Sequence, residues 1–364
     1  MKQATLLSAD EILANLDIYD SIIDVRSESE FALDHIPGAI NCPVLNDEER
    51  ARVGTIYKQE STFEARKIGA ALVAKNIATH LQQQLHDKPR DWKPLVYCWR
   101  GGNRSGSMAH ILAQIGWPAV QLIGGYRDYR RSVVTRLDEQ AAALQFRVIC
   151  GTTGSGKSRL LQYLARAGAQ VLDLEQLAAH RGSVLGGLPS EPQPSQKMFE
   201  SRIWQVLKSL SADRVIYVES ESKKIGDLRV PEKLMEKIRA SACVRLDISL
   251  ADRVALLIEE YPHLVTDTAL LGEQLGHLTQ LHGREKINAW MGLAESGQTA
   301  ALVQALLTDH YDRAYLRSIE RNFIHYREAR GLILENIREA AFVTAAQTLL
   351  DEEADVRSPE GEAV

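Results

Sequence analysis

The sequence has no apolar run close to the ~18 residues that a membrane-spanning helix needs, and its opening residues show no apolar signal core. It has only four cysteines and no CxxC pair, so neither a disulfide framework nor a zinc site is indicated. Internal repeats and low-complexity linkers are also missing. These absences exclude disulfide scaffolds and membrane spans, and they predict a cytoplasmic protein with reduced thiols and no membrane partner.

The composition is that of a globular protein, with 45% hydrophobic and 25% charged residues. A length of 364 residues suggests two or three domains. The net charge of −5 is carried by the last fourteen residues, which hold six acids and one arginine. Residues 351–364 therefore form a predicted acidic, disordered tail. Because residues 1–350 are neutral overall, a nucleic-acid partner would require basic residues that are clustered.

Buried-strand patterns alternate with helical stretches in two blocks, which predicts an α/β fold with parallel sheets. The predicted strands of the first domain, residues 1–140, are 21–25, 95–98 and 119–123. The predicted strands of the second domain, residues 141–350, are 146–150, 169–174, 214–220 and 243–249. From about Asp267 onward the pattern is almost entirely helical, so the second domain is expected to end in a mostly helical part.

Cys98 is the candidate catalytic residue of the first domain. It lies where a predicted strand passes into a helix, at the sheet edge where open α/β folds place their active sites. Glycines in the following loop allow backbone N–H groups to form an anion-binding cradle, and its positive field favours a thiolate. The predicted cradle consists of Trp99, Arg100, Gly101, Gly102, Asn103 and Arg104. The other three cysteines are interpreted as structural.

A second anion site is predicted after the strand at 146–150, where the chain satisfies the phosphate-loop pattern G-x-x-x-x-G-K-[ST]. The predicted diphosphate-binding residues are Gly151, Thr152, Thr153, Gly154, Ser155, Gly156, Lys157 and Ser158. No tightly bound cofactor is expected, although the Ser158 hydroxyl could ligate Mg²⁺. A kinase or ATPase would normally show an acidic residue, usually an aspartate, at the end of a later apolar strand. The sequence offers four acidic residues near predicted strand ends, none of which clearly matches that aspartate: Glu219, Glu221, Asp173 and Glu175. The loop thus predicts a polyphosphate site but not ATP hydrolysis.

Two basic and aromatic stretches are candidate nucleic-acid contacts, because arginine binds phosphates and aromatic rings stack on unpaired RNA bases. The candidate arginines are Arg127, Arg130 and Arg131 in the first stretch, and Arg313, Arg317 and Arg321 in the second. The second three recur every four residues, on one helix face near Tyr311 and Tyr315. The alternative is a solvated helix whose arginines pair with Asp312, Glu320 and Glu328.

Residues 22–44, IIDVRSESEFALDHIPGAINCPV, and residues 122–126, LIGGY, resemble rhodanese sulfurtransferases. The resemblance implies a persulfide, or its selenium analogue, on Cys98, and structural roles for His35, Asp24 and Arg26. Arg104 lies one residue further from Cys98 than in many rhodaneses, a spacing shared with cysteine phosphatases. A phosphatase also needs a general acid, and the sequence nominates none.

Taken over residues 10 to 345, the chain resembles the bacterial tRNA 2-selenouridine synthase family. Both motif blocks carry the resemblance, together with NDEERARVGTIYKQ in the first domain and LTQLHGREKINAW at 278–290. It implies a transferase that acts on the wobble 2-thiouridine of tRNAs of the lysine, glutamate and glutamine type. The sulfur is first geranylated by geranyl diphosphate, and selenophosphate then replaces the S-geranyl group.

The resemblance also implies contact with the enzyme that produces selenophosphate. Two other interpretations remain open on the residues alone. The chain could be a sulfurtransferase, with a persulfide on Cys98, fused to a small-molecule kinase. It could also be a non-catalytic RNA-binding protein, in which case Cys98 would be dispensable.

Overall fold

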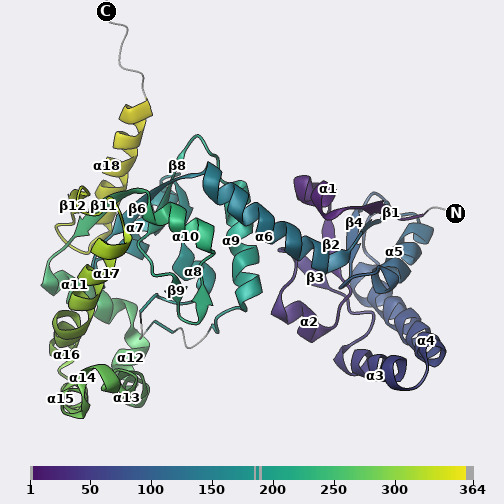
Figure 1. The fold of residues 1–364 in the computed structure, drawn as a ribbon, viewed down its shortest axis with the longest axis horizontal. Coiled ribbons are helices and arrows are strands. Elements are labelled where there is room, and N and C mark those ends of the chain that lie inside the picture. Colours follow the sequence, from purple (N-terminus) through teal and green to yellow (C-terminus); the bar gives the residue numbers. More distant parts are fainter. Residues whose placement is uncertain (1–2, 184–185, 188–190, 358–364) are drawn as a thin grey trace, which may run out of the picture. The chain divides into compact units, whose positions relative to one another are not determined.

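The computed structural model describes residues 3–183, 186–187 and 191–357. It divides into two compact units (Figure 1): Met1–Leu137 with Pro194–Gln205, and Asp138–Gln193 with Val206–Val364. The sequence places one boundary near residue 140. The return of Pro194–Gln205 to the first unit has no signal in the sequence pattern. In the part of the chain that is described, no helix is both long and apolar enough to cross a membrane.

The first unit is built on a five-stranded sheet of order β1-β5-β4-β2-β3, in which every pairing is parallel. Its strands are β1 (Thr5–Leu7), β2 (Ser21–Asp24), β3 (Ala39–Asn41), β4 (Pro94–Tyr97) and β5 (Val120–Leu122). Its helices are α1 (Ala9–Ala14), α2 (Glu28–Leu33), α3 (Asp47–Gln59), α4 (Thr62–His80), α5 (Asn103–Ile115) and most of α6 (Gly125–Ala143). The apolar core joins strand residues such as Ile23 and Val96 to Ile77 of α4 and Leu112 of α5.

The second unit contains another all-parallel five-stranded sheet, of order β12-β11-β6-β8-β7. Its strands are β6 (Gln145–Cys150), β7 (Gln170–Leu172), β8 (Val215–Glu219), β11 (Ala242–Asp247) and β12 (Arg330–Ile333), with a separate hairpin of β9 (Lys224–Ile225) and β10 (Leu228–Arg229). The helices near this sheet are α7 (Lys157–Arg166), α8 (Leu174–Ala178), α10 (Glu232–Arg239), α11 (Leu250–Glu260), α17 (Asp312–Asn322) and α18 (Glu339–Arg357). Helix α9 (Gln196–Ser209) is shared between the two units.

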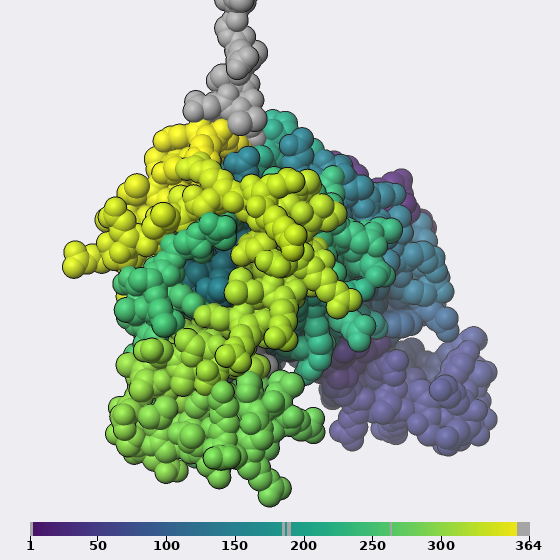
Figure 2. All heavy atoms as spheres, turned by 60° about the vertical axis from the view of Figure 1, so that its left-hand side comes forward, coloured from purple at the N-terminus to yellow at the C-terminus, as the bar shows by residue number. Residues whose placement is uncertain are grey.

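Five further helices of the second unit have an apolar core of their own, around Leu275, Trp290 and Leu302. They are α12 (Pro262–Thr266), α13 (Thr268–Gly276), α14 (Thr279–His282), α15 (Arg284–Glu295) and α16 (Thr299–Leu306). A π-helical turn, Leu307–Tyr311, connects them to α17. In Figure 2 these helices, in green, project as a lobe.

The α/β fold with two parallel sheets is confirmed, and so is a mostly helical C-terminal part, in which the short strand β12 pairs with β11 at the sheet edge. One expectation requires correction. The acidic stretch is not a free tail from residue 351, since α18 continues to Arg357. Its Glu353 is buried and accepts hydrogen bonds from the Val215 N–H and the Tyr217 hydroxyl. Residues 358–364 lie outside the described residues.

Candidate functional site

The Cys98 loop follows β4, the middle strand of the first sheet, as predicted. Gly101 and Gly102 have φ angles of +70° and +73°, a left-handed conformation that side chains rarely adopt. Their successive turns return the chain to the sheet edge, where α5 begins at Asn103. A Cβ on Gly102 would lie 2.8 Å from the Gln121 side-chain nitrogen. The double glycine is therefore what closes the loop around the cysteine.

The segment after β5 holds this loop in place. The backbone N–H groups of Tyr126 and Arg127 donate to the carbonyls of Cys98 and Trp99, over 2.8 and 3.0 Å. At Gly125 a Cβ would lie 2.2 Å from the Cys98 carbonyl oxygen, so only glycine allows this approach. The Trp99 ring also stacks on Tyr126. The glycine pair of the LIGGY segment is thus a support for the active loop.

The Cys98 thiol is enclosed, with 1% of the residue exposed. The Ser105 hydroxyl lies 3.3 Å from the Cys98 sulfur as a hydrogen-bond donor, and the thiol faces the Arg100 carbonyl at 3.6 Å. A donor aimed at the sulfur stabilises a thiolate. Ser105 was not among the predicted residues, although it directly follows Arg104 in the first turn of α5.

Arg104 does not point at the thiol. Its guanidinium binds the carboxylate of Glu30 at 2.9 Å, and Arg50 binds the same carboxylate. Although burial acts in the opposite direction, the hydrogen bond and charge of Arg104 lower the pKa of Glu30. Of the other cradle residues, Arg100 and Asn103 are exposed. The loop therefore resembles a cysteine-phosphatase cradle in spacing, but its arginine is engaged elsewhere.

The polar residues of the first unit that were predicted to be structural make contacts within the protein. Asp24 and Arg26 form a buried salt bridge of 2.6 Å, and Arg26 also binds the Asp34 carbonyl. His35 stacks on Phe31 and bonds to its carbonyl oxygen at 2.9 Å.

Cys42 and Cys150 are buried, as are Cys98 and Cys243. Burial and the nearby Asp24 charge raise the pKa of Cys42 to about 12, which keeps that thiol protonated. The hydrogen bond with Cys243, together with burial, raises the pKa of Cys150. Both cysteines are therefore poor nucleophiles.

The phosphate loop likewise follows the middle strand of its sheet, β6. Gly154 and Gly156 have positive φ angles of +76° and +85°. A Cβ on Gly151 would lie 3.0 Å from the Leu246 carbonyl oxygen, and one on Gly156 would lie 2.8 Å from the Phe342 ring. The loop is therefore a tightly packed turn into α7, whose first residue is Lys157.

Acidic side chains from two strand ends meet beside this loop. The Ser158 hydroxyl lies 2.9 Å from a carboxylate oxygen of Glu219 and 3.1 Å from one of Glu175. Glu221 completes a cluster with ligand atoms within 4.8 Å of one another. Asp173 instead caps α8 by accepting from the Gln176 N–H. Three of the four acids considered from the sequence thus converge on Ser158.

This cluster fits a magnesium ion. Burial, followed by the charges of Glu175 and Asp173, raises the pKa of Glu219 well above its ordinary value, because crowded carboxylates disfavour one another's charged forms. The second oxygen of Glu219 is buried with no hydrogen-bond partner among the described residues. Mg²⁺ prefers oxygen ligands of this kind, usually together with substrate phosphates. Lys157 directly precedes Ser158, and its ammonium donates a hydrogen bond of 3.0 Å to the Gly151 carbonyl oxygen.

Helix α17 is anchored to the phosphate loop by contacts that sequence reasoning missed. Tyr315, considered as a base-stacking ring, is half-buried beside the loop, with its hydroxyl 2.8 Å from both the Gly151 nitrogen and the Ser220 hydroxyl. Arg253 binds the Thr153 carbonyl at 2.9 Å and forms a bidentate ion pair with Asp312. No local pattern in the sequence links these residues.

The two arginine groups differ in placement. Arg313, Arg317 and Arg321 are exposed on α17. The three acids proposed as their partners are engaged elsewhere: Asp312 with Arg253, Glu320 with Arg327 and Glu328 with His325. Arg130, in contrast, is only 15% exposed and is paired with Glu200, which removes it from any open surface. The last two, Arg127 and Arg131, are more exposed and share Asp128 as a partner.

A polar hollow of about 880 Å³ surrounds the phosphate loop. Its lining includes Lys157, Ser158, Glu175 and Glu221, and it extends along α17 from Tyr311 to Asn322. The hollow is far larger than a diphosphate requires.

The fold and the two loops define a class of protein: a rhodanese-like domain with a loop cysteine, joined to a phosphate-loop domain. Family models agree, with a rhodanese-like domain matching residues 8–132 and a tRNA 2-selenouridine synthase AAA domain matching residues 144–282. The tRNA 2-selenouridine synthase of Nitrosomonas europaea is 37% identical over 262 residues, which cover 70% of this chain and 67% of that protein. The enzyme of the same name from Marinobacter nauticus is 33% identical, with 81% of this chain and 87% of the relative covered.

A third relative with that name, from Aeromonas salmonicida, is 31% identical over 87% of this chain and 93% of its own length. The chain belongs to the tRNA 2-selenouridine synthase family. It is thus an enzyme of tRNA modification, as the sequence resemblance indicates.

Proposed function

We propose that this enzyme converts 2-thiouridine in tRNA to 2-selenouridine by two successive group transfers at two different loops. The observation that carries the proposal is the presence of two separate glycine-containing loops, each after the middle strand of its own sheet. One loop holds an enclosed cysteine and the other lies beside a carboxylate cluster. Two anionic donors, geranyl diphosphate and selenophosphate, match two such loops.

In the first transfer the thiocarbonyl sulfur attacks C1 of geranyl diphosphate. A carbon–sulfur bond forms, the carbon–oxygen bond to the diphosphate breaks, and the uridine N3 proton is lost. Lys157 and the backbone of the phosphate loop bind the departing diphosphate. Mg²⁺ held by Ser158, Glu175, Glu219 and Glu221 would neutralise charge on that leaving group.

In the second transfer selenium enters at C2 and geranyl thiolate leaves, because S-alkylation has made the sulfur a leaving group. Selenophosphate already carries selenium at the selenide level, so a perselenide on Cys98 would require an oxidant. A redox-neutral role is attack of the Cys98 thiolate on phosphorus. The phosphorus–selenium bond breaks, hydroselenide is released to attack C2, and water then hydrolyses the phosphocysteine to phosphate.

The Cys98 loop supports this role by its enclosed thiol and the Ser105 donor. The tRNA is held by exposed arginines, with the α17 row Arg313, Arg317 and Arg321 as the principal group. This row lies on the helix that reaches the phosphate loop through Tyr315.

Nucleoside mass spectrometry tests the proposal. Thiolated tRNA is incubated with the full-length protein and geranyl diphosphate, with or without selenophosphate. We expect S-geranyl-2-thiouridine first and 2-selenouridine after selenophosphate is added. Lys157→Ala suppresses geranylation, whereas Cys98→Ala spares geranylation and blocks selenation, and Cys243→Ala serves as the cysteine control. Normal selenation by Cys98→Ala would overturn the cysteine's role, and unchanged tRNA with the unaltered protein would overturn the function.

A further inference from the structure

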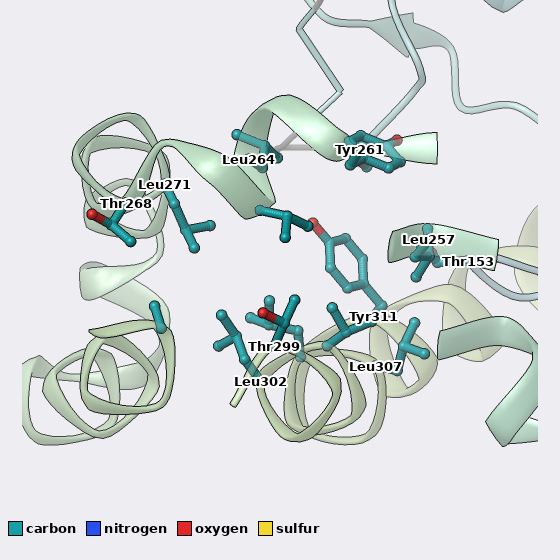
Figure 3. A pocket seen from close by; sticks show the side chains of 15 residues that line it. Thr153, Leu257, Tyr261, Leu264, Thr268, Leu271, Thr299, Leu302, Leu307 and Tyr311 are labelled. Atoms are coloured by element: carbon teal, nitrogen blue, oxygen red, sulfur yellow. The ribbon is translucent and has the colours of Figure 1, made fainter. Parts of the chain in front are cut away.

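We infer that an apolar groove beside the phosphate loop binds the hydrocarbon tail of an allylic diphosphate whose head group occupies that loop. This inference rests on the proposed function and deepens it by placing the prenyl chain. The groove is lined by 15 residues of the second unit (Figure 3). They come from α11, α12, α13, α15, α16, the π-helical turn and three connecting segments, and none carries a charge.

The chemistry of the lining selects an apolar occupant. Leucines and valines predominate, and the few polar members are threonines, a serine and two tyrosines. A nucleobase buried here would leave several of its polar edges without partners, which is unfavourable. The cavity volume of about 80 Å³, against the ~10–15 Å³ that one water needs, describes a narrow cleft. Such a cleft suits a linear hydrocarbon chain.

The groove adjoins the polar hollow of the phosphate loop. Five residues line both: Thr153, Ser183, Leu257, Tyr261 and Tyr311. At this junction the loop touches the groove wall directly, because a Cβ on Gly154 would lie 2.9 Å from the Leu257 side chain. Arg253 fixes the loop here through its hydrogen bond to the Thr153 carbonyl.

Figure 3 gives the groove a direction. Thr153 and Leu257 lie at one end, Thr268 and Leu271 at the other, and the Tyr311 ring stands between them. A diphosphate bound at the loop would therefore project its chain from the Thr153 end toward Leu271. C1, the carbon that reacts, would then sit at the junction of the two cavities, and the part of the polar hollow that the diphosphate does not fill would remain for the tRNA.

Binding measurements with a graded series of ligands test this placement. The full-length protein is titrated calorimetrically with inorganic, dimethylallyl and geranyl diphosphate. Each buried methylene is worth about fourfold in affinity, so geranyl diphosphate should bind about tenfold or more tighter than dimethylallyl diphosphate. Ala294→Leu narrows the groove from α15 and should remove that advantage while leaving inorganic diphosphate binding unchanged. Ala289→Leu, an exposed position on the same helix, is the matched control.

Photolabelling provides a second measurement that needs no variant. A geranyl diphosphate with a diazirine on its terminal isoprene unit should label peptides that contain Leu302 or Leu271. If the protein geranylates tRNA but Ala294→Leu behaves like Ala289→Leu and the label falls elsewhere, the groove is the wrong site and the proposed function stands. If geranyl diphosphate binds no tighter than inorganic diphosphate and tRNA is not geranylated, the proposed function itself fails.

Discussion

The Tyr315 hydroxyl accepts a hydrogen bond of 2.8 Å from the backbone N–H of Gly151, the first residue of the phosphate loop. The two residues are 164 positions apart in the chain. The Lys157 ammonium also lies over the Tyr315 ring, 5.6 Å from the ring centroid. Through this contact the helix that carries the exposed arginines is tied to the phosphate loop. In the proposed function, RNA bound along α17 and a diphosphate bound at the loop would therefore contact one connected element.

Removing the tyrosine hydroxyl should weaken diphosphate binding without removing the ring. In Tyr315→Phe the buried Gly151 N–H loses its partner, which is worth ~1–3 kcal/mol. We expect the affinity for inorganic diphosphate to fall about tenfold, because the loop is no longer held in its binding conformation. Calorimetric titration measures this change. Tyr163→Phe, on α7 in the same unit, should bind diphosphate normally, and an unaltered affinity in Tyr315→Phe would contradict the role given to the contact.

Ser105 offers a test confined to the cysteine loop. Ser105→Ala removes the donor that faces the Cys98 sulfur, so the thiolate is less stabilised. Alkylation of Cys98 by iodoacetamide at pH 7 and the rate of selenation should both decline by about tenfold, the effect of losing ~1.4 kcal/mol. Geranylation should continue at the normal rate. Ser107→Ala is the control, because that hydroxyl bonds to the Asn103 carbonyl on the exposed side of the same helix.

The sequence predicted what depends on local pattern. Both anion loops were located because a strand, glycines and a helix start follow one another within a few residues. The carboxylate cluster could be nominated but not selected, since Glu175 and Glu219 meet only because β7 and β8 are neighbours in the sheet. Sheet order is a property of the whole fold.

Other parts escaped prediction for physical reasons. β12 has four residues, of which only Leu332 is buried, so it lacks the apolar run of a typical strand. The sequence pattern suggests that Arg130 is exposed, but Glu200 of α9 pairs with it and leaves its side chain largely buried. The apolar groove is formed by 15 separate residues between positions 153 and 311. Most of them, considered one at a time, resemble ordinary core positions.

Magnesium dependence should distinguish the carboxylate cluster from the acids at the rim of the hollow. Glu219→Gln removes one carboxylate ligand next to Ser158. If this weakens Mg²⁺ binding by about 1.4 kcal/mol, about tenfold more Mg²⁺ is needed for half-maximal geranylation. Chelation of divalent cations should abolish geranylation by the unaltered protein. Glu259→Gln, at an exposed acid paired with Arg159, should leave the magnesium requirement unchanged. Geranylation that proceeds normally in excess chelator would show that the cluster serves another purpose.

The arginine row on α17 should account for part of the salt dependence of tRNA binding. Each arginine that neutralises a phosphate releases counterions, so its loss lowers the slope of log K against log salt by about one. Arg317 is the middle member of the row and is exposed, which makes Arg317→Ala a minimal change to the fold.

We expect Arg317→Ala to weaken tRNA binding at low salt with this reduced slope, as measured by filter binding across a salt series. Diphosphate affinity should be unchanged, because Tyr315 still anchors the helix. Arg338→Ala removes an exposed arginine outside the row and should leave both the affinity and the slope intact. If the two variants bind tRNA equally well, the RNA is held by another surface and the α17 row is only a solvated helix face.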